Sequence, residues 1–365
     1  MNLFIGIVGL PNVGKSTLFN TITNSNVEAA NYPFATIKPN VGVVAVPDER
    51  LTKLAQLIHP KKVTPAICQF VDIAGLVKNA SKGEGLGNQF LANIRETHAI
   101  CHVIRCFEDK AITHVYDNVD PKRDMEIVNV ELIISDLDLV NKKIEKNYRK
   151  GQSGDKLAQK LIALYTKIKD HLSQNKLIKD LSLDEEEKQT IKHDGFLTAK
   201  PVLYIANVDD ASQEAIVNNK HYQKLKSLLS TNDLLLPVSI KLEYEISLLN
   251  DQERQEFIRS LNLSYTGLDK LIMTAYKLLN LSSFFTFGED EVKAWTFNNG
   301  MLAPECAGLI HSDIQKGFIR VEVMNSSDLI NLKSEKNVRA AGLLRVEGKD
   351  YVIKDGDVCY FRFNI

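Results

Sequence analysis

A glycine-rich segment near the N-terminus has the residue types and spacing of a phosphate-binding loop. Residues 9–16 read Gly-Leu-Pro-Asn-Val-Gly-Lys-Ser, the pattern G-x-x-x-x-G-K-S. Glycines allow successive backbone N–H groups to wrap a phosphate, and a helix that starts there points its positive end at the same anion. The lysine of this pattern contacts the β- and γ-phosphates, and the serine hydroxyl can bind Mg²⁺. We therefore assign Lys15 to catalysis and six consecutive residues to nucleotide binding: Asn12, Val13, Gly14, Lys15, Ser16 and Thr17.

Two further motifs favour a nucleotide-dependent switch over a kinase or a helicase. Thr36 lies one predicted helix beyond the loop, at a distance from which it can close on Mg²⁺ and the γ-phosphate. Residues 67–75 read as a strand that ends in Asp72-Ile-Ala-Gly75, the pattern D-x-x-G. Asp72 can hold Mg²⁺ through water, and the Gly75 N–H can sense the γ-phosphate. The predicted metal ligands are therefore Ser16, Thr36 and Asp72, and Gly75 joins the nucleotide-binding residues.

The segment that would contact the nucleotide base departs from the guanine-binding pattern. The predicted strand 201–206 leads into Asn207-Val208-Asp209-Asp210, where a guanine-specific protein has N-K-x-D. In that pattern the aspartate binds the guanine N–H groups and the lysine packs on the base, but Val208 stands at the lysine position. We assign Asn207 and Val208 to nucleotide binding. The residues thus indicate a base site whose preference is not the standard one.

These motifs need a sheet that brings several strand ends together. Residues 3–8 form a short apolar run without alternation, which is typical of a strand buried on both faces of a parallel α/β sheet. Ligands bind at the carboxyl ends of such strands, where the motifs above also stand. The predicted fold is therefore α/β, with a Ras-like P-loop G domain. A length of 365 residues leaves room for a second domain.

Residues 127–172 predict two helices joined by a reversal. Two apolar stripes recur at spacings of three and four, and residues 151–154, Gly-Gln-Ser-Gly, form a natural turn between them. We expect an antiparallel helical hairpin inserted in the G domain, an arm at about 127–197; the alternative for the first half is that it packs flat on the core. The stripes are Ile127, Val130, Ile134, Leu137, Ile144 and Tyr148, and then Leu157, Leu161, Leu164, Ile168 and Leu172.

The arm is strongly basic, although the whole chain has a net charge of −1. Residues 142–179 include 11 Lys/Arg and 3 Asp/Glu, a net charge of +8. Lysine-rich helices are usually only solvated faces. An excess this large at the end of a projection favours contact with a phosphate backbone, and ribosomal RNA is the most plausible partner.

The remainder of the chain predicts a smaller second domain. Residues 284–363 contain several β-type runs with turns at Gly348 and Gly356 and one helix at about 326–331, which suits a mixed β-grasp module. The predicted boundaries are 1–281 and 282–365. Five cysteines without a C-x-x-C pair indicate free thiols in a reducing cytosol. We expect no signal peptide and no membrane contact, because no apolar run is long enough to cross a bilayer, and so a cytoplasmic location.

Several long blocks closely resemble the YchF-type Obg-like ATPases, and the similarity runs nearly from end to end. The resemblance implies a G domain, an inserted helical hairpin and a C-terminal TGS domain. It also implies Mg²⁺-dependent hydrolysis of ATP in preference to GTP, and association with the ribosome, as large subunit and as 70S particle, in translation or a stress response. Asp210 departs from the family, which usually has glutamate there, and is nearer the guanine pattern. The blocks are residues 9–16, 31–44, 72–78, 83–88, 90–97, 105–109 and 348–357.

One residue that hydrolysis normally requires is missing from the usual place. Ras-like proteins have glutamine directly after D-x-x-G to orient the attacking water, but here that residue is Leu76, which cannot hydrogen-bond. The resemblance points to His114 as the group that positions water; a surface histidine without a role is the alternative. The leading function is an ATPase switch. The rivals are a ribosome-binding module with incidental hydrolysis and, supported only by Asp210, a GTP-preferring assembly or translation factor.

Overall fold

The structure, a computed structural model, describes residues 3–24, 40–73, 86–260 and 264–364. The chain divides into two compact units. The P-loop unit comprises residues 4–24 and 70–267, and the C-terminal unit comprises residues 1–3, 25–69 and 268–365.

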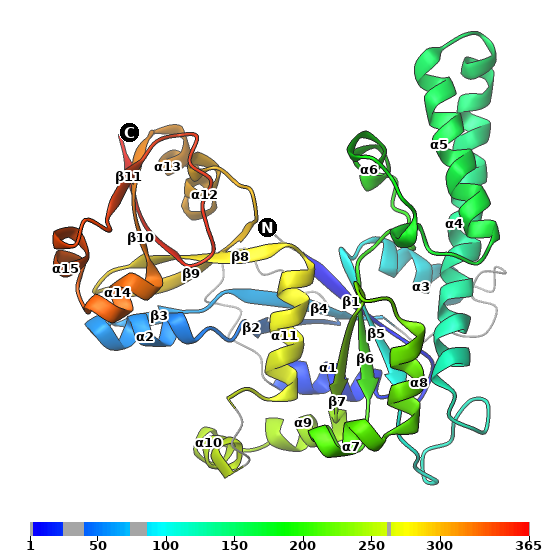
Figure 1. Ribbon diagram of the computed structural model, residues 1–365, viewed down its shortest axis with the longest axis horizontal. Coiled ribbons are helices and arrows are strands. Elements are labelled where there is room, and N and C mark those ends of the chain that lie inside the picture. Colours follow the sequence, from blue (N-terminus) through cyan, green and yellow to red (C-terminus); the bar gives the residue numbers. More distant parts are fainter. Residues whose placement is uncertain (1–2, 25–39, 74–85, 261–263, 365) are drawn as a thin grey trace. The chain divides into compact units, whose positions relative to one another are not determined.

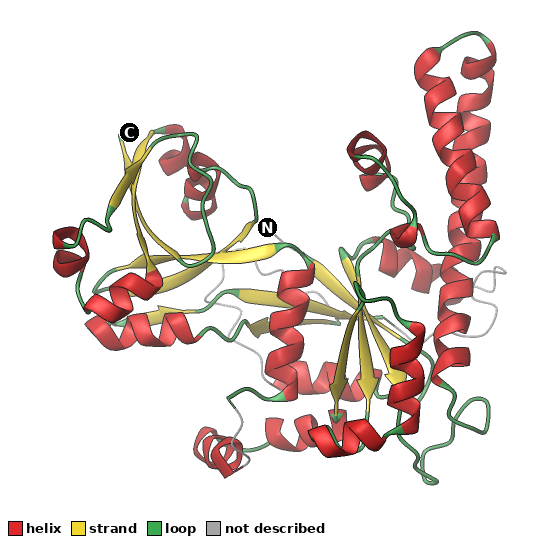
Figure 2. Ribbon diagram, in the orientation of Figure 1, coloured by secondary structure: helices red, strands yellow, loops and turns green. Residues whose placement is uncertain are grey.

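A parallel sheet forms the centre of the P-loop unit (Figure 2). Its strands are mostly apolar, as expected for a sheet covered on both faces, and all seven residues of β5 (Ala99–Arg105) are buried. Helices of this unit outside the arm are α1 (Lys15–Asn24), α3 (Leu86–Arg95), α7 (Gln213–Asn218), α8 (Lys220–Leu228), α9 (Ile240–Ser247) and α10 (Asp251–Ser260). The strand order is β4 (Ile67–Asp72, of which the second half belongs here), β1 (Phe4–Val8), β5 (Ala99–Arg105), β6 (Val202–Asn207) and β7 (Leu234–Val238). The predicted α/β fold is confirmed.

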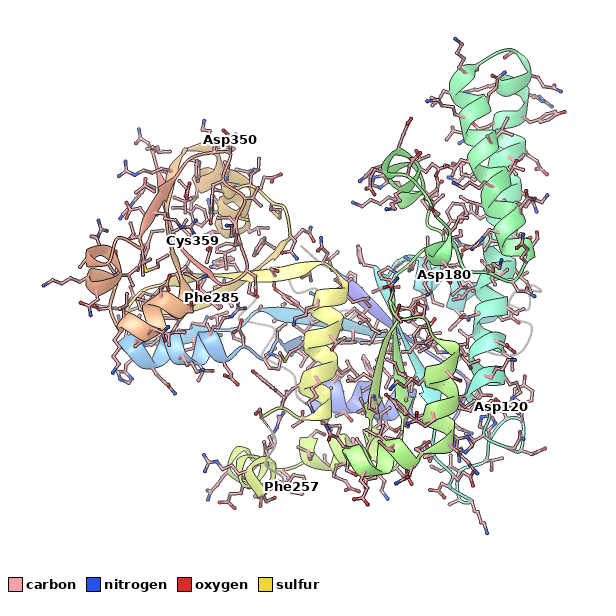
Figure 3. The ribbon with its side chains drawn as sticks, viewed as in Figure 1. Asp120, Asp180, Phe257, Phe285, Asp350 and Cys359 are labelled. Atoms are coloured by element: carbon pink, nitrogen blue, oxygen red, sulfur yellow. The ribbon has the colours of Figure 1, made fainter. Side chains whose placement is uncertain are left out.

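Two helices pack side by side to form the predicted arm, α4 (Pro121–Gln152) and α5 (Lys156–Ser173) (Figure 1). With 32 residues, α4 is about 48 Å long at 1.5 Å per residue. Asp120 caps its N-terminus by accepting hydrogen bonds from two backbone N–H groups, at the end of the helix opposite the hairpin turn (Figure 3). The turn falls at the expected glycines, with Gly154 at φ +91°. A short helical turn, η3 (Ile178–Asp180), and α6 (Glu185–Lys192) lead the chain back.

The apolar stripe predicted for the first half of the arm is partly wrong. Val130 and Tyr148 of that stripe are exposed, and so is Leu157 at the start of the second stripe. The first part of α4 packs on the sheet, where Met125 joins a buried cluster with residues of β5, β6 and α8, so Val130 is not needed in a hairpin core. From Ile133 onward α4 forms a hairpin core with α5, in which Leu164, Ile168 and Leu172 are buried as expected, together with Ile133, Val140, Tyr165, Leu177, Ile178, Ile191 and Phe196.

The C-terminal unit contains a mixed sheet in the order β11-β10-β12-β8-β9-β3. Phe284, Phe297 and Val321 lie in its buried core. The expected helix near residue 326 is present as α14. The strands of this sheet are β3 (Lys62–Thr64), β8 (Leu281–Phe287), β9 (Glu291–Asn298), β10 (Phe318–Asn325), β11 (Arg345–Glu347) and β12 (Asp357–Phe363). The elements of the unit outside this sheet are β2 (Val41–Ala45), α2 (Glu49–Ile58), α11 (Gly267–Leu278), α12 (Ala303–Ile310), α13 (Ser312–Lys316), α14 (Ser326–Leu332) and α15 (Glu335–Ala340).

A segment from the first quarter of the chain is built into this C-terminal unit. Strand β3 pairs in parallel with β9 at the edge of the sheet. From α2, Arg50 donates hydrogen bonds to both carboxylate oxygens of Asp355, at 2.8 and 3.2 Å, and its guanidinium lies over the ring of Phe285. No pattern in the sequence predicted this association, because three strand residues carry too little periodicity to identify a pairing partner.

All five cysteines are buried and none forms a disulfide, as expected for thiols that serve as small core residues. Among the described helices, none combines the length and apolarity needed to cross a membrane.

Candidate nucleotide-binding site

The predicted phosphate-binding loop joins β1 to α1, and its backbone requires the residues found there. Gly9 and Gly14 have φ of +155° and +105°. A Cβ atom at Gly9 would lie 2.4 Å from the carbonyl oxygen of Val103, and one at Gly14 would lie 2.6 Å from Asn207 Nδ2. Asn12 adopts φ 61°, a left-handed conformation that asparagine tolerates better than most residues. The loop therefore has the backbone conformation that glycine permits and leads directly into α1, as an anion site at a helix N-terminus requires.

Lys15 is buried at this helix start, with its Nζ donating to the carbonyl of Leu10 at 2.6 Å. Burial lowers the pKa of Lys15 to about 8, while the nearby Asp72 carboxylate opposes this shift. Burial likewise raises the pKa of Asp72, and Lys15 acts in the other direction. The fold thus places Lys15 and Asp72, at the end of β4, close enough beside the loop to interact electrostatically.

The residues present suit Mg²⁺ bound with a nucleotide. Mg²⁺ takes oxygen ligands and is usually held by one or two protein groups together with phosphates and water. Ser16 is exposed in the first turn of α1, and Asp72 lies close enough to Lys15 to interact electrostatically. Among the residues that the structure describes, no group of three or more His, Cys, Asp or Glu side chains could hold a metal by itself. Thr36, Gly75 and Leu76 lie outside the described residues.

Asn207, at the end of β6, joins the phosphate-binding loop to the segment that follows β7. Its Nδ2 donates to the carbonyl of Val13 at 2.9 Å, and its Oδ1 accepts from the backbone N–H of Ile240 at 3.2 Å. The side chain is buried, and the amide uses a donor and an acceptor at once. Asn207 therefore joins the phosphate-binding loop to the segment after β7, and these two bonds leave one of its N–H donors and one acceptor position unused.

Two other residues of the base segment lie differently from the guanine pattern. The side chain of Val208 is buried in the cluster with Ile104 and Leu225, so only its backbone could approach a base. Asp210 is exposed, and its Oδ1 accepts from the backbone N–H of Ser212 at 2.8 Å. Thr17, the last residue assigned to the loop, is exposed on α1.

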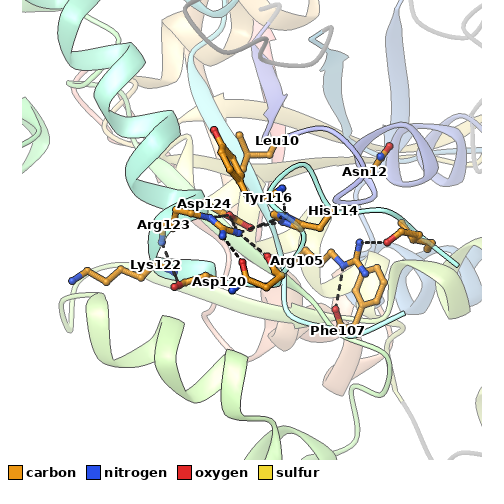
Figure 4. A network of polar contacts seen from close by, with 12 residues as sticks. Leu10, Asn12, Arg105, Phe107, His114, Tyr116, Asp120, Lys122, Arg123 and Asp124 are labelled. Atoms are coloured by element: carbon orange, nitrogen blue, oxygen red, sulfur yellow. Dashed lines mark hydrogen bonds and ion pairs between the residues drawn. The ribbon is translucent and has the colours of Figure 1, made fainter. Parts of the chain in front are cut away.

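His114 lies in the loop between β5 and α4, residues 106–120, which we call the His114 loop. It is buried, with Nε2 2.9 Å from Asp124 Oδ2 and Nδ1 accepting from the backbone N–H of Tyr116 at 3.1 Å (Figure 4). The loop is tied to the phosphate-binding loop because Asn12 Nδ2 donates to the carbonyl of Thr113 at 3.1 Å. The predicted position beside the nucleotide site is therefore supported, but the ring is not exposed.

The sequence did not single out the residues that hold this loop. Arg105 is buried at the end of β5, and its guanidinium donates to the carbonyls of Phe107, Asp109 and Ile112 at 3.0–3.1 Å. An arginine at the end of an otherwise apolar strand is the signal that could have identified it. Asp124 gave no such signal, since an acidic residue in the first turn of a helix is common for electrostatic reasons alone.

A parallel sheet with a glycine-rich loop, a buried lysine at a helix start and an aspartate at a neighbouring strand end defines a P-loop nucleotide-binding fold. Two family models match the chain: "50S ribosome-binding GTPase" over residues 4–135, and the C-terminal YchF GTPase family, described as "Protein of unknown function (DUF933)", over residues 281–364.

Curated relatives and a solved structure match over nearly the whole chain. A protein of Mycoplasma genitalium is 52% identical and one of Bacillus subtilis is 48% identical, each over 100% of both chains, and both are named "Ribosome-binding ATPase YchF". The YchF GTPase structure from Schizosaccharomyces pombe is 40% identical with a TM-score of 0.87, covering 99% of this chain and 98% of that one. The chain belongs to the YchF family.

Proposed function

We propose that the chain is a Mg²⁺-dependent nucleoside triphosphatase that prefers ATP to GTP and acts as a switch on the ribosome. The observation that carries the hydrolase assignment is the buried Lys15 beside Asp72 at the glycine-rich loop. The full-length relatives named as ribosome-binding ATPases support the same assignment. A cytoplasmic location and a role in translation or a stress response belong to this proposal.

The residues of the site would divide the work as follows. Backbone N–H groups of residues 12–17 hold the phosphates, and Lys15 places a positive charge on the β- and γ-phosphates. Ser16 and Asp72, with Thr36, would hold Mg²⁺, which neutralises charge on the phosphate oxygens when it is bound. His114 would position the attacking water, because Leu76 offers no hydrogen-bonding group.

The preference for ATP rests on the base segment. Position 208, which carries lysine in the guanine pattern, is a buried valine here, so no lysine stem packs on the base. Asp210 Oδ1 accepts from the Ser212 N–H, an interaction that would compete with a contact of both oxygens to the two guanine N–H groups. ATP and GTP affinities, measured side by side by calorimetry on the nucleotide-free protein, test this. We expect tighter binding of ATP. A GTP affinity tenfold above that of ATP, about 1.4 kcal/mol, would instead support the GTP-preferring alternative.

The basic arm is the proposed contact with ribosomal RNA, on the large subunit and the 70S particle. Part of the charge counted from the sequence is neutralised inside the arm, since Lys143 pairs with Asp194, Lys160 with Glu186 and Lys167 with Glu187. Around the turn, the cations are exposed and have no ion pair among the described residues. These arm-tip cations are Lys142, Lys146, Arg149, Lys150 and Lys156.

Charge reversal at the arm tip tests this contact. Lys146, Arg149 and Lys150 stand three and four residues apart on α4, so they share one face. Replacing all three with glutamate should weaken ribosome binding at moderate salt and flatten its dependence on salt, because fewer phosphate counterions are released. The matched control reverses Lys226, Lys270 and Lys349, which are exposed elsewhere. Equal losses in the two triple variants would show that only overall charge matters.

The division into a G domain at 1–281 and a TGS domain at 282–365 is also a proposal. The separate family models, which cover 4–135 and 281–364, support a boundary near residue 281. Residues 40–66 group with the C-terminal unit in the structure, so the G-domain sequence is not one compact body.

A further inference from the structure

The His114 side chain has no free hydrogen-bonding nitrogen in this structure. The Tyr116 N–H points at Nδ1, so Nδ1 is the acceptor of a neutral ring and the proton is on Nε2, which donates to Asp124. The ring is also buried. A water molecule at the γ-phosphate cannot be positioned by a ring whose two nitrogens are both occupied. The role proposed for His114 therefore requires the ring to leave this place.

Asp124 has a second partner besides His114, so its carboxylate would stay paired if the ring left. Its other oxygen, Oδ1, accepts from Arg123 Nε at 3.0 Å and Nη2 at 2.9 Å. Arg123 is itself fixed, because it donates to the side chain and carbonyl of Asn118 at 2.6 and 2.7 Å and lies over the Tyr116 ring. If the imidazole departs, the carboxylate keeps its arginine partner and is not left as an unpaired buried charge.

The remainder of the His114 loop is anchored independently of Asp124. The Arg105 guanidinium holds three loop carbonyls, and Asn12 binds the Thr113 carbonyl. The described contacts of the ring itself are Asp124, the Tyr116 N–H, the tilted Tyr116 ring at 6.3 Å between centroids, and a longer approach of Arg123 Nη2, at 3.5 Å. Loss of the Asp124 contact would remove the charge-assisted bond among these while the loop around the ring stays attached.

We propose that Asp124 is a positioning residue that holds His114 withdrawn and thereby sets a low basal rate of nucleotide hydrolysis. The inference rests on the proposed function of His114. It assigns opposite effects to two residues in direct contact: His114 promotes hydrolysis, and Asp124 restrains it.

Single-turnover hydrolysis of saturating Mg-ATP by the full chain tests the proposal. Asp124→Ala should be faster than the wild type, by roughly tenfold or more, because one hydrogen bond to a charged group no longer holds the ring. Asp124→Asn, which keeps an acceptor oxygen in place, should fall between them. The double variant with His114→Ala should be as slow as His114→Ala alone. Glu126→Ala, an exposed carboxylate on the same helix, is the control and should match the wild type.

The outcomes separate failure of the restraint from failure of the proposed function. If His114→Ala hydrolyses ATP at the wild-type rate, the role of His114 is wrong. If His114→Ala is slow but neither Asp124 variant is faster than the wild type, the restraint alone is wrong. Should Asp124→Ala fail to fold, Asp124→Asn carries the same comparison.

Nitrogen-15 spectra of the histidine rings give a second readout that a purely structural role would not change. The wild type should show a single Nε2–H tautomer for His114, and Asp124→Ala should show a tautomeric average. An unchanged tautomer in Asp124→Ala contradicts the proposal.

Discussion

At the scale of single residues, Lys15 is a buried cation whose charge a bound anion would stabilise. Its ammonium donates to one carbonyl of the loop, and the remaining donors have no other partner among the described residues. We expect Lys15→Ala to abolish ATP hydrolysis. The free energy of unfolding should be unchanged or higher, because burial penalises the charged lysine in the absence of ligand. Hydrolysis assays and urea unfolding check the two parts, and normal turnover in the variant would overturn the site assignment.

The shifted pKa of Lys15 also predicts how nucleotide affinity changes with pH. In the free protein this pKa is about 8, below its ordinary value of 10.5, and a bound triphosphate should raise it again by favouring the charged form. Above about pH 8 the complex then holds more protons than the free protein, so affinity falls as pH rises, by at most tenfold per pH unit. Below about pH 8 the lysine is charged in both states, and this contribution is constant.

Calorimetry between about pH 7.5 and pH 9.5 measures that dependence, with proton uptake checked in two buffers of different ionisation enthalpy. Lys15→Arg is the control, since a guanidinium stays charged over this range and its affinity should be flat. A wild-type affinity that does not change over the same range would show that Lys15 is already neutral, or already charged, in both states.

Residue patterns alone identified the loop and Asp72 but not the contacts that hold His114. The loop could be predicted because glycine spacing and a following helix encode its backbone directly. The assignment of Asn207 to nucleotide binding stays a prediction, but the bonds of its amide to Val13 and Ile240 were not predicted. The assignment of Val208 also stays a prediction, and the pattern did not show that its side chain lies in the core. Contacts between segments about 100 residues apart are set by packing, which a local pattern does not record.

At the scale of elements, one buried carboxylate on α4 holds the chain segment that returns from the arm to the sheet. Asp136 on α4 accepts from the backbone N–H groups of Leu197 and Thr198, at 3.0 and 2.7 Å, and from the Thr198 hydroxyl at 2.7 Å. The side chain is fully buried. The returning chain after α6 therefore depends on an acceptor that α4 supplies.

Asp136→Ala should lower the free energy of unfolding by about 3 kcal/mol or more, because it leaves three buried donors without this acceptor. Asp138→Ala, an exposed carboxylate two residues along the same helix, should change it by less than about 0.5 kcal/mol. Urea unfolding followed by circular dichroism gives both values. Equal stabilities would mean that water replaces the carboxylate at these groups.

The helices of the arm show why the hairpin could be predicted better than its packing. The turn at residues 151–154 and the stripe of α5 are local features, and the structure contains the turn and the stripe except for Leu157, which is exposed. The stripe of α4 changes partner halfway along, from the sheet to α5, so a single heptad pattern cannot describe it. The same limit applies to the arm charge, because the acidic residues that neutralise part of it follow later in the chain.

At the scale of the molecule, two compact units share a chain that passes between them more than once. Residues 25–69 stand between the phosphate-binding loop and Asp72 in sequence, yet they group with the C-terminal unit. Composition and β-type runs predicted the strands of that unit after residue 281. They could not predict β3, because its partner β9 lies more than 200 residues away in the sequence.

In the proposed switch, the bound nucleotide changes the contact with the ribosome, and co-sedimentation with purified ribosomes measures that change. The bound fraction should be measured with Mg-ATP, with Mg-ADP and without nucleotide, with Lys15→Ala as the control. We expect ribosome affinities with ATP and with ADP to differ by about fivefold or more in the wild type, as a coupling between two sites requires, and the difference to vanish in Lys15→Ala. Equal binding in all three conditions, while hydrolysis continues, would contradict the switch and leave a ribosome-binding protein whose hydrolysis is incidental.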